Sequence, residues 1–211
     1  VNDAFKELQQ YHKAWKEDIG PVSQEHREKV WQKFSAASKK IHDKRHDYFR
    51  SLKSQYQDII DKKLEIVETI ENYDTSKNKK HSDWQKSIND IEVLRKQYFD
   101  AGKLPYNKSE DVWQKFKAAT KKFNAAKNVF YKKEKSVQQD NLDKKKALIA
   151  LAESFKDSED WENATNAMKR IQADWKKIGH VPRKFSDDIW KRFKAACNLY
   201  FDRYHNRQDD L

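Results

Sequence analysis

Apolar side chains recur at every third or fourth position through long stretches that contain neither glycine nor proline. The longest of these stretches are residues 23–72 and residues 109–155. In the second stretch, aromatic side chains keep this helical spacing at Trp113, Phe116, Phe123 and Phe130. Residues spaced in this way lie on one face of an α-helix. The pattern therefore predicts two long helices of about 45–50 residues, each roughly 70 Å long.

The same group of residues occurs three times along the chain. In each copy a glycine is followed eleven residues later by a tryptophan, and three residues after that by a phenylalanine: Gly20, Trp31 and Phe34; Gly102, Trp113 and Phe116; Gly179, Trp190 and Phe193. The glycines are 82 and then 77 residues apart. Internal repetition of this kind is typical of helical-repeat arrays, in which each repeat packs against its neighbours.

The residues before each glycine also correspond between copies. The second and third copies share four bulky positions: Trp84, Ile91, Leu94 and Tyr98 match Trp161, Met168, Ile171 and Trp175. In the first copy Leu8, Tyr11 and Trp15 take the last three places, and Val1 takes the first. A shorter helix is therefore expected before each glycine. The predicted fold is all-α, an elongated array of repeats in which two long helices alternate with shorter ones.

Glycine and proline mark the corners between these helices. Each glycine is expected to end a helix in the left-handed conformation, which suits a residue without a Cβ. A nearby proline, Pro21, Pro105 or Pro182, would stop the helix from continuing. A serine is then expected to cap the next helix, at Ser23, Ser109 and Ser186. Three helix–turn–helix corners follow, each with its Trp and Phe rings packed in the core.

Three repeats result from this alignment, at residues 1–72, 73–155 and 156–211. The first would be truncated at its N-terminal end and the third at its C-terminal end, and neighbouring repeats are expected beyond both ends. Residues 131–146 are polar nearly all round, which predicts a solvated helical bridge between repeats. Loops are expected at residues 72–84, with a capping box of Ser82 and Gln85, and at residues 156–161.

Composition supports a helical fold with a thin core. Of the 211 residues, 36% are hydrophobic and 37% are charged, and there are three glycines and three prolines. The 27 aromatic residues (7 Trp, 9 Tyr and 11 Phe) argue against disorder. The single cysteine, Cys197, excludes a disulfide framework and suits a reducing compartment. No apolar run approaches membrane-spanning length, and no signal peptide is recognised.

The third copy resembles a bacterial repeat family known as domain of unknown function 349. The shared pattern is Trp-Lys-x-Ile-Gly-x-Val-Pro followed by Trp-x-x-Phe-x-x-Ala, here residues 175–182 and then Trp190, Phe193 and Ala196. The middle copy lacks the Trp-Lys pair, and the first copy has Pro21 directly after Gly20. The resemblance implies an all-helical array in a cytoplasmic bacterial protein. It implies no chemistry.

Charge suggests one candidate binding surface. The chain carries a net charge of +11, and residues 103–135 alone hold ten lysines against Glu110, Asp111 and Glu134, a balance of +7. On a helix Lys115, Lys122 and Lys133 fall on one side, with Lys121 and Lys132 beside them. A row of lysines suits phosphate contacts. The alternative interpretation is a solvated face with no partner. Because lysine dominates over arginine, base-specific recognition is not expected.

Other candidate sites favour structural interpretations. The Trp and Phe residues could stack on single-stranded nucleic acid, but their helical spacing favours core packing. His42 and His46 could chelate a metal, although zinc needs three or four ligands, and a surface pair is the better interpretation. Cys197 aligns with Ser38 and Thr120, which indicates a small packing residue rather than a nucleophile. No glycine-rich phosphate loop is present, and a thin helical array offers little of the pocket with converging groups that catalysis needs. No enzymatic activity, cofactor or small-molecule substrate is therefore expected.

The sequence therefore favours a non-enzymatic scaffold that docks on RNA or a ribonucleoprotein through the basic face. The alternative is a protein–protein scaffold with no nucleic-acid role, which would grip a partner helix between repeats. Attachment to an anionic membrane surface is a weaker third hypothesis, because an inserting helix would show a broad apolar face.

Overall fold

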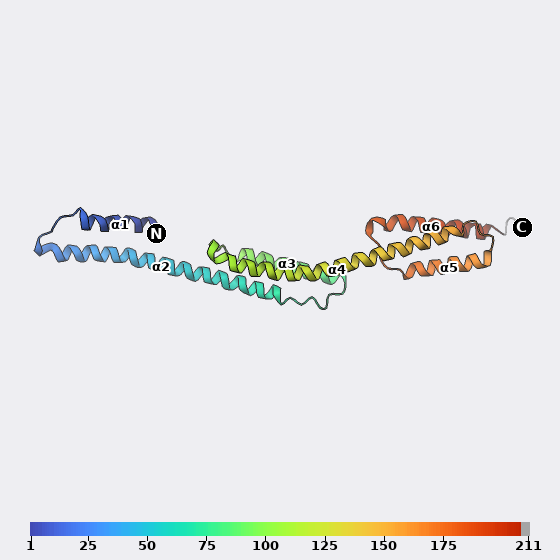
Figure 1. Cartoon of the computed structure of the whole chain (residues 1–211), viewed down its shortest axis with the longest axis horizontal. Helices are drawn as coiled ribbons and strands as arrows, with labels where there is room; N and C mark the ends of the chain where they lie inside the picture. The colour runs from blue at the N-terminus through green and yellow to red at the C-terminus, as the bar shows by residue number, and fades with distance from the viewer. Residues whose placement is uncertain (208–211) are drawn as a thin grey trace. The chain divides into compact units, whose positions relative to one another are not determined.

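The computed structural model describes residues 1–207 and contains six α-helices (Figure 1). Their bounds are Asn2–Glu17 (α1), Gln24–Glu71 (α2), His81–Asp100 (α3), Tyr106–Ser154 (α4), Trp161–Lys177 (α5) and Arg183–Asn206 (α6). No strand occurs among the described residues. The helices α2 and α4 have 48 and 49 residues and alternate with shorter ones. The prediction of an all-α array with two long helices is therefore confirmed.

The chain forms two compact units, one from Val1 to Phe123 and one from Asn124 onward. The boundary falls within α4, so this helix contributes residues to both units. The predicted repeat bounds do not coincide with these units and stay a prediction. None of the helices in the part of the chain that the structure describes is both long and apolar enough to cross a membrane.

In the first unit, α1 packs along the N-terminal part of α2. The Trp15 ring stacks on Phe34 with their centroids 4.3 Å apart. The Nε2 atom of His12 lies 2.8 Å from the Oγ atom of buried Ser38, at hydrogen-bond distance. Leu8 is the buried apolar residue of α1. A stacked pair of rings thus fixes how the two helices pack.

The same unit contains a second packing centre, formed by the C-terminal part of α2, by α3 and by α4 as far as Phe123. Here Tyr98 stacks on Phe116, with centroids 4.0 Å apart. The ammonium group of Lys63 lies 4.5 Å from the centroid of the Tyr98 ring, and burial lowers the pKa of this lysine. Apolar residues of all three helices are buried around this pair: Val67, Ile70, Trp84, Ile91, Val112 and Ala119.

The second unit repeats this arrangement with α4 from Asn124 onward, α5 and α6. Trp175 stacks on Phe193, with centroids 3.9 Å apart and planes 3° from parallel. The ammonium group of Lys145 lies 4.7 Å from the centroid of the Trp175 ring, and burial lowers its pKa too. The hydroxyls of Thr165 and Tyr200 form a buried hydrogen bond of 2.8 Å. Leu142, Ile149 and Ala152 complete this core from α4.

The corners differ from the predicted ones in detail. Only Gly102 has a positive φ, of 133°, so the expected left-handed helix end is wrong for Gly20 and Gly179. Ser23 does occupy the N-cap of α2, but its side chain makes no capping hydrogen bond. Ser109 and Ser186 lie inside α4 and α6. These helices begin directly after Pro105 and Pro182, whose carbonyls accept hydrogen bonds from backbone N–H groups of the first helical turn.

Two further predictions need correction. The helix α3 begins at His81, and its N-cap residue is Lys80. The carboxylate of Asp83, the third residue of the helix, completes a capping box by accepting 3.0 Å hydrogen bonds from the backbone N–H groups of Lys79 and Lys80. Ser82 and Gln85 therefore do not form the capping box. Residues 131–146 are helical and mostly exposed, but they are not a purely solvated segment, because Leu142 within them is fully buried.

Candidate functional site

The five candidate lysines lie on α4 and divide between the two units. Lys115, Lys121 and Lys122 belong to the first unit, and Lys132 and Lys133 belong to the second. All five side chains are exposed. Phe116 and Phe123, on the aromatic stripe of α4, are buried in the core. The amphipathic pattern of α4 therefore places these lysines in solvent within each unit, as predicted.

Lys122 differs from the other four lysines. Its ammonium group donates a 3.2 Å hydrogen bond to the backbone carbonyl of Glu71, the last residue of α2. Carbonyls in the last turn of a helix have no partner within the helix, so this lysine satisfies one of them. Lys122 therefore has a structural role at the end of α2 and is less available to a partner than the prediction assumed.

The remaining candidates, Lys115, Lys121, Lys132 and Lys133, make no ion pair or hydrogen bond with the rest of residues 1–207. Four ion pairs occur among the described residues, and none involves the basic stretch 103–135. The positive charge of this stretch is therefore not neutralised within either unit. An anion that approached it would meet exposed lysines without displacing an internal partner.

The lysines Lys39 and Lys40, which correspond to Lys121 and Lys122, were not predicted as candidates from the sequence. Lys39 and Lys40 of α2 stand 82 residues before Lys121 and Lys122, the same offset that relates Gly20 to Gly102. Both are exposed in the first unit. The 82-residue offset could have identified them, because it applies to the lysines as well as to the aromatic motif. The first two copies therefore share this lysine pair, whereas the third copy has Asn198 and Leu199 at the equivalent positions.

The tryptophans that define the motif lie at the rim of the core. Phe116 and Phe193 are buried, as expected, but Trp31 and Trp190 are half exposed. The rings that stack on the buried phenylalanines come from the preceding helix, where Trp175 covers Phe193. The expectation that the motif tryptophans are core residues is thus wrong for Trp31 and Trp190. Each indole leaves one side open to solvent.

The histidine and cysteine candidates have structural surroundings. His42 is exposed, with its ring centroid 5.7 Å from that of Phe5 and 6.1 Å from that of His12. Residues 1–207 contain no group of three or more His, Cys, Asp or Glu side chains that could hold a metal ion. Cys197 is buried, and burial raises the pKa of its thiol, which disfavours the nucleophilic thiolate. Its predicted packing role is confirmed.

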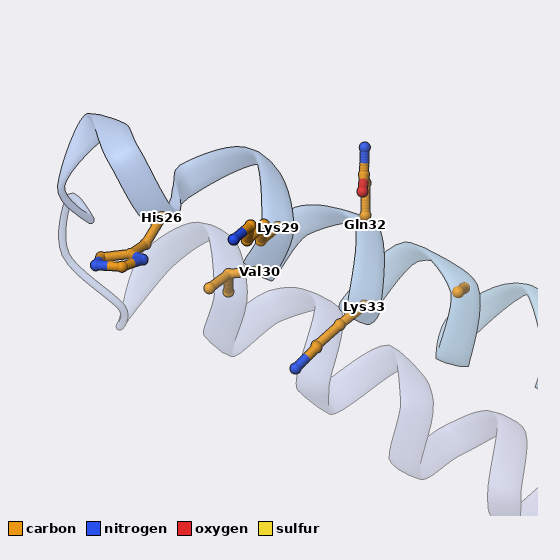
Figure 2. Close-up of a pocket in the computed structure, with 6 residues that line it drawn as sticks. His26, Lys29, Val30, Gln32 and Lys33 are labelled. Atoms are coloured by element: carbon orange, nitrogen blue, oxygen red, sulfur yellow. The ribbon is translucent and has the colours of Figure 1, made fainter.

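Two open hollows lie on the first unit beside α1 and α2. One, of about 800 Å³, is at the Gly20 corner and is lined by Trp15, Ile19 and Trp31 among others. The other, of about 490 Å³, lies on α2 and is lined by His26, Lys29, Val30, Gln32, Lys33 and Ala36 (Figure 2). Figure 2 shows Lys33 extending to one side of α2 and Gln32 to the opposite side. These hollows combine apolar and basic side chains and bring together no catalytic set.

Comparison with known families identifies the chain. Residues 29–107 and 111–184 match the family described as Domain of Unknown Function (DUF349). Each matched segment begins two residues before a motif tryptophan, Trp31 or Trp113, and extends past the next glycine corner. The two matches cover more than half of the chain, so the protein belongs to this family. Neither the curated proteins nor the solved structures gave a match.

Proposed function

We propose that this member of the family is a non-enzymatic helical-repeat scaffold that docks on RNA, free or within a ribonucleoprotein, in the cytoplasm. The observation that carries the proposal is the set of exposed lysines on α4 without an internal partner: Lys115 and Lys121 in the first unit, Lys132 and Lys133 in the second. They belong to a stretch with ten lysines and three carboxylates.

The chemistry of these lysines favours contact with phosphate rather than with base edges. Each ammonium group that meets a phosphate releases condensed counterions, so affinity grows with the number of contacts and falls with salt. The lysines stand on a regular helix, so their spacing within each unit is fixed before binding. Lysine acts as a point charge without the planar fork of arginine. We therefore expect binding that depends little on RNA sequence.

Charge reversal tests this proposal. The variant carries Lys115→Glu, Lys121→Glu, Lys132→Glu and Lys133→Glu, which spares the structural Lys122. The control reverses four exposed lysines elsewhere, Lys6, Lys13, Lys169 and Lys176, and so changes the net charge equally. Binding to a single-stranded RNA is measured by fluorescence anisotropy from 50 to 300 mM salt. A plot of the logarithm of the binding constant against the logarithm of the salt concentration has a negative slope. The α4 variant should reduce the magnitude of this slope by up to about 3, and the control should change it less.

Two results would contradict the proposed function. If both variants weaken RNA binding equally, the affinity reflects net charge and not the α4 lysines. If partners recovered from cells are retained after ribonuclease treatment at high salt, the protein is a protein–protein scaffold. Reversing the Lys115 and Lys121 pair separately from the Lys132 and Lys133 pair shows which unit contributes.

A further inference from the structure

The three glycine corners have the same local sequence pattern, but one of them is less covered than the others. Val30, Val112 and Ile189 are equivalent, each lying one residue before the motif tryptophan. Val112 and Ile189 are each 4% exposed, whereas Val30 is 38% exposed. The contrast recurs on the preceding helix, where Ile171 is 2% exposed and Leu94 is partly buried, whereas their counterpart Tyr11 is 55% exposed. The first copy therefore presents to solvent a face that its counterparts bury.

A third helix accounts for the difference. The second copy is covered by residues 57–71 of α2, and the third copy by residues 139–153 of α4; we call these the covering segments. Their sequences, QDIIDKKLEIVETIE and QDNLDKKKALIALAE, are 82 residues apart and share Gln-Asp, Asp-Lys-Lys and a final Glu. In both segments the glutamine side chain donates a hydrogen bond to the aspartate four residues later, Gln57 to Asp61 and Gln139 to Asp143. They are two copies of one helical element.

The covering segments contact their corners through equivalent positions. Lys63 lies over the Tyr98 ring and Lys145 over the Trp175 ring. The residue four positions before each lysine, Ile59 or Asn141, lies close to the corner glycine. A Cβ added to Gly102 would lie 2.7 Å from Ile59, and one added to Gly179 would lie 3.1 Å from Asn141. The amide of Asn141 also donates a 2.8 Å hydrogen bond to the carbonyl of His180.

The corresponding positions of the first copy are open. A Cβ added to Gly20 would meet nothing within 4 Å. Among residues 1–207, no lysine lies over the Trp15 ring, the counterpart of Tyr98 and Trp175. The hollows beside Trp15 and Val30 lie on this part of the first unit. Lys33 corresponds to Arg192, which pairs with Glu153 at the end of the covering segment at 3.3 Å.

We propose that the open face formed by Tyr11, Trp15, Gly20, Val30 and Lys33 binds an amphipathic α-helix with the pattern of the covering segments. Such a helix would place a lysine over Trp15, apolar residues against Val30 and Tyr11, and its final glutamate beside Lys33. Residues 1–207 contain two helices of this pattern, and both are already packed in their own copies. The occupant is therefore a separate helical segment of this chemistry. This inference does not depend on the proposed RNA binding.

A peptide tests the inference directly. A fluorescent peptide with the sequence of residues 136–155 is titrated with the 211-residue protein, and anisotropy is measured. We expect saturable binding at one peptide per protein. Val30→Glu should weaken it at least tenfold, because Val30 is solvent-exposed in the free protein and the substitution changes only the docking face. The control, Val129→Glu on α4, changes an exposed valine outside every packing centre and should leave affinity unchanged.

Peptide variants test the register. Replacing the residue equivalent to Lys145 by glutamate should weaken binding at least fivefold, and replacing its exposed neighbour Lys144 in the same way should have less effect. Because an isolated peptide can be poorly helical, the same segment is also fused ahead of Val1 through a flexible linker, which raises its effective concentration. Hydrogen exchange at residues 8–15 should then slow relative to the unfused protein.

Three outcomes would overturn the inference. The first is that the peptide does not bind and that hydrogen exchange at residues 8–15 is the same in the fusion as in the unfused protein. The second is binding that Val30→Glu and Val129→Glu weaken equally. The third is self-association of the protein, measured by sedimentation, that Val30→Glu abolishes, because a second copy would then be the occupant. The four-lysine α4 variant should bind the peptide normally, which separates failure of this inference from failure of the proposed RNA binding.

Discussion

At the scale of residues, each copy of the repeat is built around one pair of stacked rings. Trp15 on Phe34, Tyr98 on Phe116 and Trp175 on Phe193 have ring centroids 4.3, 4.0 and 3.9 Å apart. In each pair one ring comes from the short helix and the other from the following helix. Stacked rings of this kind add about 0.5–1.5 kcal/mol to the gain from burying their area. The pair therefore fixes the approach of the two helices.

In the third copy the motif residue Phe193 is buried and the motif residue Trp190 is half exposed, which leads to a prediction about their contributions to stability. Phe193→Ala should lower the free energy of unfolding by about 3–5 kcal/mol, because it leaves a cavity beneath Trp175. Trp190→Ala should lower it by less than roughly half of that amount, since half of the indole is already in water. Urea unfolding followed by circular dichroism measures both. Equal losses would show that the motif tryptophan is a core residue after all.

The positions of Lys63 and Lys145 over aromatic rings were not predicted from the sequence, for a physical reason. Lysine is rarely buried, and its presence in a polar stretch normally indicates solvent. Lys63 is an exception to this rule, because it is buried with its ammonium group 4.5 Å from the centroid of the Tyr98 ring. The ammonium group of Lys145, which is partly buried, lies 4.7 Å from the centroid of the Trp175 ring. The shared Asp-Lys-Lys at residues 61–63 and 143–145 was a visible signal, but its meaning required knowledge of which helices pack together.

A pH dependence follows from Lys145, one of the two lysines whose pKa burial lowers. Because burial lowers the pKa of Lys145 in the folded state, the unfolded chain binds more protons as the pH approaches the ordinary lysine value of 10.5. Stability therefore rises with pH wherever this difference exists. Unfolding of the wild type and of Lys145→Met is compared at pH 7 and pH 10. The wild type should gain stability relative to the variant, and a relative loss would contradict the assigned environment.

At the scale of elements, the long helices were predictable and their ends were not. Long stretches without glycine or proline located α2 and α4 to within three residues at each end. Helix ends depend on a few local hydrogen bonds and dihedral angles that several residues can supply. The first residues of α4 and α6 follow Pro105 and Pro182, where proline rather than the expected serine sets the start.

The glycines provide a matched test of the corners. Gly102→Ala should destabilise the protein by about 1–3 kcal/mol, because its φ of 133° is strained for alanine and the new Cβ would approach Ile59. Gly20→Ala should change stability by less than about 1 kcal/mol, and toward greater stability, because it reduces the entropy of the unfolded chain. Thermal unfolding of the two variants gives the comparison. Similar losses at both positions would contradict the difference between the corners.

At the scale of the whole molecule, one packing scheme is used three times. The repeat was evident from spacing, as was the basic character of α4. The identity of the covering helices was not, because the pairing of segments distant in sequence is decided by packing rather than by local pattern. The candidate lysines were correctly expected to be exposed, yet Lys122 caps α2 through a carbonyl that no sequence pattern reveals. RNA binding stays a proposal that rests on charge and exposure.

The central claim is that the three copies share one packing scheme and that, within residues 1–207, no covering helix lies on the first copy. Hydrogen–deuterium exchange of the free protein tests this most directly, because local opening depends on how much apolar surface holds each helix in place. Amides of residues 8–15 should exchange at least tenfold faster than those of the equivalent residues 91–98 and 168–175. Equal protection in all three segments would contradict the account.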